Sequence, residues 1–130
     1  MATKSRNFLL AMAAFWLCFG LGTIFYPRIM QLFMTPAGIA ASTPFSDQVW
    51  LHGGMDILSV CLLLFALSAV PPTRRTLQLA STVALMPMIA MIYTFVATSY
   101  WSSMFFVPAA ACLAFAVYGF SIARQIPDAH

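Results

Sequence analysis

The stretch VWLHGGMDILSVCLLLFALSAV, residues 49–70, decides the fold of this chain. It is long enough to cross the hydrocarbon core of a bilayer, which takes roughly 20 helical residues. Close to its start it carries His52 and Asp56, one helical turn apart. Because a charged group inside hydrocarbon is costly, an acid in such a segment needs a partner or a function.

The rest of the chain has the same apolar character. Of the 130 residues, 62% are hydrophobic and 7% are charged, and the mean hydropathy is +0.91. Soluble domains contain roughly 25% charged residues, so this composition indicates an integral membrane protein. The chain has three acidic residues, and Asp56 is the one that lies inside an apolar segment.

Four apolar segments predict an all-α fold, a membrane four-helix bundle that forms a single domain over residues 1–130. The predicted spans are residues 8–26, 49–70, 76–97 and 101–123. The Tyr26-Pro27 and Pro71-Pro72 pairs end the first two spans, because proline interrupts helical hydrogen bonding.

Basic residues are distributed unevenly between the two ends of these spans. With four spans, both termini and the 71–75 turn lie on one side, which carries Lys4, Arg6, Arg74, Arg75 and Arg124. The other side carries Arg28. Since basic residues favour the cytoplasmic side, we expect both termini in the cytoplasm and a multi-pass protein of a bacterial-type inner membrane, in contact with its lipid. The pattern is a topology signal and does not indicate a nucleic-acid partner.

Small residues recur along the last span with a 3-4-3-4 spacing, at Ala109, Cys112, Ala116, Gly119 and Ala123. Such a stripe lets another helix approach closely, either in the same chain or in a neighbouring subunit. A shorter stripe marks the first span, at Ala11, Ala14 and Cys18. We expect the three cysteines, each within an apolar span and without metal-site spacing, to be buried and reduced.

Polar residues form a stripe at the second span, consisting of Gln48, His52, Asp56 and Ser59. On a helical wheel they lie within about 80 degrees of one another and descend about 16 Å at roughly 1.5 Å per residue. Gly53 and Gly54 carry no side-chain bulk, which leaves room beside His52 for a flat ligand or another backbone. Tyr93, near the outer end of the third span, is expected at the depth of His52 and Asp56.

Each of these residues also has a plain structural interpretation. His52 fits a hydrated interfacial histidine, and Asp56 fits a hydrogen-bonding partner of His52 or of a neighbouring helix. Ser59 fits a serine bonded to its own helix, Gln48 a loop-end residue and Tyr93 an ordinary membrane tyrosine. The functional alternatives are metal or haem ligation by His52, and proton handling or substrate orientation by Asp56. A haem needs as little as one axial imidazole and an apolar wall.

Three short motifs resemble styrene oxide isomerase, a family of small four-span bacterial membrane enzymes. They are VWLHGGMDIL at residues 49–58, PPTRRTLQLA at residues 71–80 and MIYTFVA at residues 91–97. The resemblance implies a homotrimer that binds haem b at its subunit interfaces, with His52 as the axial iron ligand and Tyr93 orienting the substrate. The chain departs from the family at Leu58, which stands roughly where the family has an asparagine.

The resemblance implies an isomerase that converts an apolar epoxide, taken from the bilayer, into an aldehyde or ketone. Haem iron would act as a Lewis acid in ring opening, a 1,2-hydride shift would follow, and Tyr93 would hold the epoxide oxygen. Asp56 has no clear counterpart in the family, and we expect it as a second catalytic side chain from its position beside His52. Two alternatives come from other classes. One is a small proton-coupled transporter in which Asp56 and His52 exchange a proton, and the other is a non-catalytic subunit of a larger membrane complex.

Overall fold

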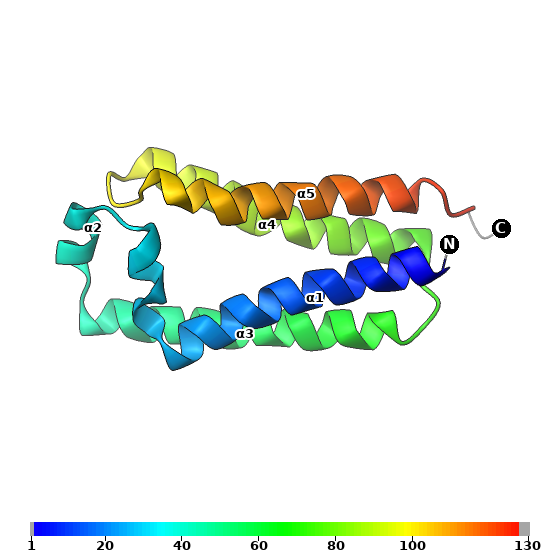
Figure 1. The fold of residues 1–130 in the computed structure, drawn as a ribbon, viewed down its shortest axis with the longest axis horizontal. Helices are drawn as coiled ribbons and strands as arrows, with labels where there is room; N and C mark the ends of the chain where they lie inside the picture. Colours follow the sequence, from blue (N-terminus) through cyan, green and yellow to red (C-terminus); the bar gives the residue numbers. More distant parts are fainter. Residues whose placement is uncertain (1, 128–130) are drawn as a thin grey trace.

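The computed structural model describes residues 2–127, so Asp128 and His130 of the C-terminal tail lie outside the described residues. Four long helices run back and forth along one axis (Figure 1): α1 (Ala2–Phe25), α3 (Pro44–Ser68), α4 (Arg74–Ala97) and α5 (Phe106–Ala123). Each of these regions is long and apolar enough to cross a membrane, with the fourth counted from Ser103. The predicted all-α membrane protein with four spans is confirmed.

Threonine caps set where the second and third spanning helices, α3 and α4, begin, and a proline contributes at α3. The Thr43 hydroxyl accepts a hydrogen bond from the Ser46 N–H (3.2 Å), and the Ser46 hydroxyl accepts one from the Thr43 N–H (2.9 Å). This capping box, with Pro44 in the first turn, starts α3 upstream of residue 49. Thr73 caps α4 in the same way, by accepting from the Thr76 N–H at 3.1 Å.

The four long helices form two antiparallel hairpins. Helix α1 packs against α3 and helix α4 against α5, whereas contacts between the two hairpins are fewer and run mainly from α1 to α5 (Figure 1). The most deeply buried side chains come from all four helices and include Leu9, Met12, Cys61, Leu77 and Cys112.

The stripe of small residues on α5 packs within this chain. All of its members are buried, namely Ala109, Cys112, Ala116, Gly119 and Ala123. At Gly119 the approach is closest, because a Cβ there would clash with the Ser81 hydroxyl and lie 2.5 Å from the Phe8 ring. Of the two alternatives for this stripe, the structure therefore shows packing against other helices of the same chain.

The shorter stripe of small residues on α1 lies on the exposed surface of that helix. Ala11, Ala14 and Cys18 are all exposed on the outer side of the helix. The expectation that every cysteine is buried is therefore wrong for Cys18, which is exposed, and right for Cys61 and Cys112.

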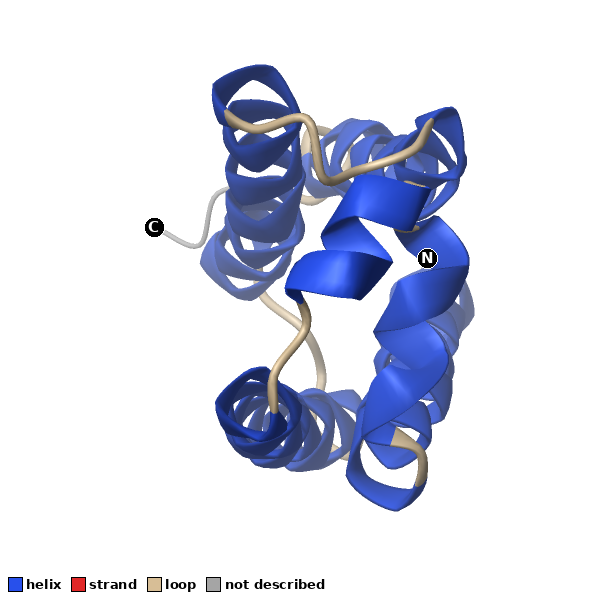
Figure 2. Cartoon of the chain, turned by 90° about the vertical axis from the view of Figure 1, so that its left-hand side faces the viewer, coloured by secondary structure: helices blue, strands red, loops and turns tan. Residues whose placement is uncertain are grey.

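The segment between α1 and α3 forms a cap on one end of the bundle, and Figure 2 views the molecule from that end. The cap contains the 3-10 helix η1 (Pro27–Phe33) and the short helix α2 (Pro36–Ala41). A contact of 3.6 Å between Arg28 and Asp47 joins the cap to the start of α3.

Backbone hydrogen bonds tie the cap to the link between α4 and α5. The Thr35 N–H donates to the Tyr100 carbonyl and the Ser102 N–H donates to the Phe33 carbonyl, both at 2.8 Å. Gly38 lies so close to the Tyr100 carbonyl that a Cβ at residue 38 would clash with it. The cap therefore connects the α1–α3 hairpin to the α4–α5 hairpin at the end away from the termini.

Candidate functional site

A cavity of about 270 Å³ lies between the two hairpins, near the cap. Side chains from α1, η1, α3 and α4 line it, together with the link before α5 and the 3-10 helix η2 (Ser103–Phe105). The chain has three tryptophans, and all of them line this cavity: Trp16, Trp50 and Trp101. The cavity thus joins residues that are far apart in the sequence.

Aromatic side chains form the part of the cavity wall at the cap end. The rings of Trp50 and Trp101 meet edge to face with centroids 5.9 Å apart. Trp101 also stacks on Phe105 with a centroid distance of 4.2 Å. Edge-to-face contacts such as that of Trp50 with Trp101 are favourable for aromatic rings, so these side chains pack against one another in the wall.

The two adjacent glycines of α3 have different surroundings. A Cβ at Gly54 would clash with the Thr23 hydroxyl and lie 3.0 Å from the Gly20 carbonyl, so Gly54 allows α1 and α3 to touch. A Cβ at Gly53 would meet no atom within 4 Å, and Gly53 lines the cavity. The room predicted beside His52 is therefore real at Gly53 and filled by α1 at Gly54.

One buried polar atom of a residue beside the cavity has no partner. The hydroxyls of Thr23 and Thr94 donate to carbonyls of their own helices, at 2.9 Å to Gly20 and 3.0 Å to Ala90. The indole N–H of Trp16 has no acceptor, although this side chain is only 5% exposed. Over residues 2–127 it is the one buried side-chain nitrogen or oxygen found without a hydrogen bond.

The polar stripe of α3 lies outside this cavity, although Asp56 borders a groove that shares Trp16, Ile57 and Pro87 with the cavity. The members of the stripe are all exposed, namely Gln48, His52, Asp56 and Ser59. The cavity side of α3 carries Trp50, Gly53 and Ile57, and His52 and Ser59 lie on the opposite side of the helix. The Ser59 hydroxyl donates to the carbonyl of Met55 at 3.2 Å, as its plain structural interpretation predicts.

His52 and Asp56 are not bonded to each other. Within the part of the chain that the structure describes, neither side chain forms a hydrogen bond or an ion pair. Asp56 borders a groove of about 140 Å³ together with Trp16, Val83 and Pro87, whereas His52 lines neither this groove nor the cavity. Two ionisable groups therefore stand unpaired on the outward face of a membrane-spanning helix.

Tyr93 also points outward, from α4. Its side chain is 72% exposed, and the cavity side of that helix carries Pro87, Met91 and Thr94 instead. A single chain therefore does not bring Tyr93 together with His52 and Asp56 in one pocket.

Trp16 is the residue of this region that the sequence patterns did not single out. Its position in the sequence could have drawn attention to it. Tryptophans of membrane proteins are enriched at the two interfaces, whereas Trp16 lies in the middle of the first span. A mid-span indole must find an acceptor for its N–H in a place where water is scarce.

The comparisons of this chain with protein-family models, with curated proteins and with solved structures found no match. What the site does must therefore be inferred from its own residues.

Proposed function

We propose that the protein is a membrane-embedded, haem-dependent isomerase of apolar epoxides that works as a homo-oligomer, with a homotrimer implied by the resemblance. The observation that carries the proposal is the unpaired, exposed pair of His52 and Asp56 on a spanning helix. Ionisable groups at membrane depth are expensive unless protein, a bound group or water covers them. We further propose a bacterial-type inner membrane with both termini in the cytoplasm.

The residues present fit a haem on the outward face of α3 and not inside the chain. The internal cavity, at about 270 Å³, lies just below the roughly 300–1,000 Å³ of pockets for drug-sized ligands, and a porphyrin is larger than most of those ligands. On the outward face, the imidazole of His52 is exposed and has no other partner, so His52 would hold the iron. Gly53 and Gly54 lie toward the cavity and α1, so His52 alone supports haem b in this proposal.

The substrate would bind between neighbouring subunits. A bound ferric haem supplies a Lewis acid for opening the epoxide ring without net redox change. The Tyr93 hydroxyl is exposed and would donate a hydrogen bond to the epoxide oxygen, and Asp56 would orient the substrate or hold a proton beside the groove that it borders. The apolar surfaces around them would exclude water, which otherwise converts the opened epoxide into a diol.

The first test is the absorption spectrum of the detergent-purified protein, with and without dithionite. We expect a Soret band that shifts on reduction and that is lost in the His52→Ala variant, because the axial imidazole is removed. Leu62→Ala is the control: Leu62 is 71% exposed on the same helix and should keep the pigment. A colourless wild-type protein after haem supply, or a pigmented His52→Ala protein, would contradict the proposal and favour the transporter or the non-catalytic subunit.

The second test concerns Tyr93. We expect Tyr93→Phe to lower the turnover of styrene oxide by about 100-fold at unchanged haem content, since one donor to a developing oxyanion is typically worth that much. Tyr118→Phe is the matched control, because Tyr118 is another exposed tyrosine, on α5, at 51% exposure. Full activity in the Tyr93→Phe protein would remove Tyr93 from the reaction.

A further inference from the structure

A groove of about 330 Å³ opens between α1 and α5, near the end of the bundle where the two termini lie (Figure 1). Two polar side chains and four apolar or aromatic ones line it, namely Lys4, Asn7, Phe8, Ala11, Phe115 and Tyr118. The ring of Phe8 is buried and contacts the rings of Phe115 and Tyr118, with centroids 6.3 and 6.1 Å apart. The groove therefore combines an aromatic floor with a polar part at the start of α1.

The polar part of the groove has unused hydrogen-bond donors. Among the residues that the structure describes, neither Lys4 nor Asn7 forms a hydrogen bond or an ion pair through its side chain, and both are exposed. The groove lining includes no acidic side chain, so the Lys4 ammonium has no counterion there. A ligand that matches these donors brings a negative charge to Lys4 and a second acceptor oxygen to Asn7.

The depth of the groove in the membrane narrows the class of ligand. The first span begins at Thr3, so Lys4 lies in its first turn, at the membrane surface. Lysines in such a position keep the ammonium group in the headgroup region while the hydrocarbon stem lies along apolar surface. The negative charge that is most abundant at this depth is the phosphate of an anionic lipid.

The surface of α1 below the groove is shaped for an acyl chain. Lys4, Asn7, Ala11, Ala14 and Cys18 follow a 3-4-3-4 spacing, so they share one side of the helix, and all are exposed. Ala14 lies about 15 Å along the helix from Lys4 at roughly 1.5 Å per residue, which is about the depth of one leaflet. A lipid with its phosphate at Lys4 would therefore lay an acyl chain over the small side chains of this stripe.

We infer that this groove binds an anionic phospholipid, with the phosphate at Lys4, a glycerol or headgroup oxygen accepting from the Asn7 amide, and an acyl chain along Ala11 and Ala14. Phosphatidylglycerol has this chemistry. A zwitterionic lipid such as phosphatidylethanolamine adds an ammonium group, for which the groove lining has no acid. The site lies at the end of the bundle away from the cap, so it stands or falls independently of the haem proposed at His52.

Native mass spectrometry of the purified full-length protein in detergent tests this inference, because it counts the lipids bound to each chain. The probes are dioleoyl phosphatidylglycerol, dioleoyl phosphatidylethanolamine and soluble glycerol phosphate. We expect phosphatidylglycerol to saturate at one lipid per chain and to bind about fivefold more tightly than phosphatidylethanolamine, as the charge of one basic residue at the surface predicts. Glycerol phosphate has the same anionic group without acyl chains and should not displace the lipid at equal concentration.

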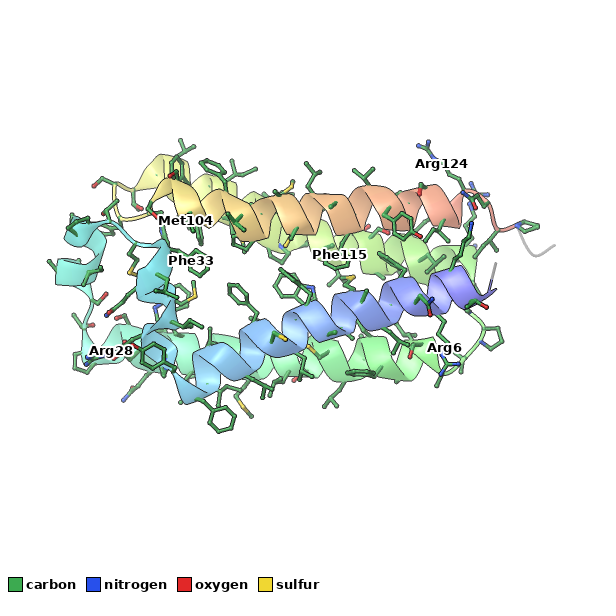
Figure 3. All side chains as sticks on the ribbon, viewed as in Figure 1. Arg6, Arg28, Phe33, Met104, Phe115 and Arg124 are labelled. Atoms are coloured by element: carbon green, nitrogen blue, oxygen red, sulfur yellow. The ribbon has the colours of Figure 1, made fainter. Side chains whose placement is uncertain are left out.

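Variants distinguish the groove from the general positive charge at this end of the bundle. Lys4→Gln should weaken phosphatidylglycerol binding about tenfold, because it removes a charge-assisted hydrogen bond to the phosphate. Arg6→Gln is the matched control: Arg6 is an exposed basic residue at the same end (Figure 3), but it does not line the groove and its loss should leave the affinity unchanged. Ala11→Phe adds a ring inside the groove and should abolish saturable binding.

Several outcomes would overturn the inference. Equal affinity of the wild-type protein for the two lipids would remove the role of charge, and equal losses in Lys4→Gln and Arg6→Gln would replace the groove by attraction to the whole basic end. Displacement of the lipid by an equal concentration of glycerol phosphate would mean a site for a free phosphate group. The comparison of the three probes in the wild-type protein needs no variant, so a variant that fails to fold does not rescue the inference.

Discussion

Gly119 and Gly53 both lie within spanning helices, yet their surroundings differ completely. A Cβ at Gly119 would clash with the Ser81 hydroxyl, whereas a Cβ at Gly53 would meet no atom within 4 Å. Association of helices in a membrane depends on close packing of small residues rather than on hydrophobic burial. Gly119 therefore holds the α5 side of the bundle together, and Gly53 does not contribute to packing.

This difference predicts opposite effects of the same substitution. Gly119→Ala should lower the free energy of unfolding by about 1–2 kcal/mol, because overpacking typically costs about 1–3 kcal/mol and the gain in helix propensity offsets part of that. Gly53→Ala should leave stability unchanged or raise it by up to about 1 kcal/mol. Titration with sodium dodecyl sulfate, followed by circular dichroism, measures both. Equal effects of the two substitutions would show that the Gly119 contact is not fixed.

The sequence predicted which polar residues share one side of α3, but it could not predict whether that side faces the bundle or a neighbouring molecule. Periodicity places Gln48, His52, Asp56 and Ser59 on one side of a helix, and the structure agrees that all are exposed. In a soluble protein a polar stripe would mark the outer side of the helix. In a membrane both sides of the helix are apolar, so the pattern alone does not distinguish a stripe facing the bundle from one facing a neighbouring molecule.

Helix α3 has two different sides as a result. One side closes the cavity through Trp50, Gly53 and Ile57, and the other side presents His52 and Asp56 to whatever covers the bundle.

The long helices were predictable from the length of each apolar run, and the cap was not. The sequence predicts residues 27–48 as a loop, whereas the structure shows η1, α2 and an early start of α3 at Pro44. Thr43 and Pro44 carried the signal for that early start. Thr35 and Gly38 contact Tyr100, which is far from them in the sequence. These contacts depend on a close approach of two backbone segments, and no local sequence pattern predicts it.

The sequence predicted only in part which helices pack against each other. The small-residue stripe of α5 predicts a close neighbour without naming it, and the structure places that neighbour in the same chain. The contact of Gly20 with Gly54 fixes the α1–α3 hairpin in the same manner. The stripe on α1 with Ala11, Ala14 and Cys18 stays uncovered in one chain.

The two ends of the bundle differ in charge. Arg6 and Arg124 extend from one end, and Arg28 lies at the other end with the cap (Figure 3). Helix α1 begins and α5 ends at the same end of the molecule, as an even number of spans requires (Figure 1). Because basic residues are retained in the cytoplasm, this difference favours a cap that faces away from it. A cap on that side would place the cavity near the membrane surface that faces away from the cytoplasm, beneath Trp50 and Trp101.

Labelling of single cysteines tests this orientation in intact spheroplasts. With Cys18, Cys61 and Cys112 replaced by alanine, a cysteine at Ala41 in the cap should react with a membrane-impermeant maleimide added from outside. A cysteine at Gln125, which is exposed at the other end, should react only after the membrane is permeabilised. Both should react in detergent, which controls for accessibility. The reverse pattern would place the cap in the cytoplasm, and labelling of both sites in intact cells would mean a mixed orientation, so that charge does not decide how this bundle inserts.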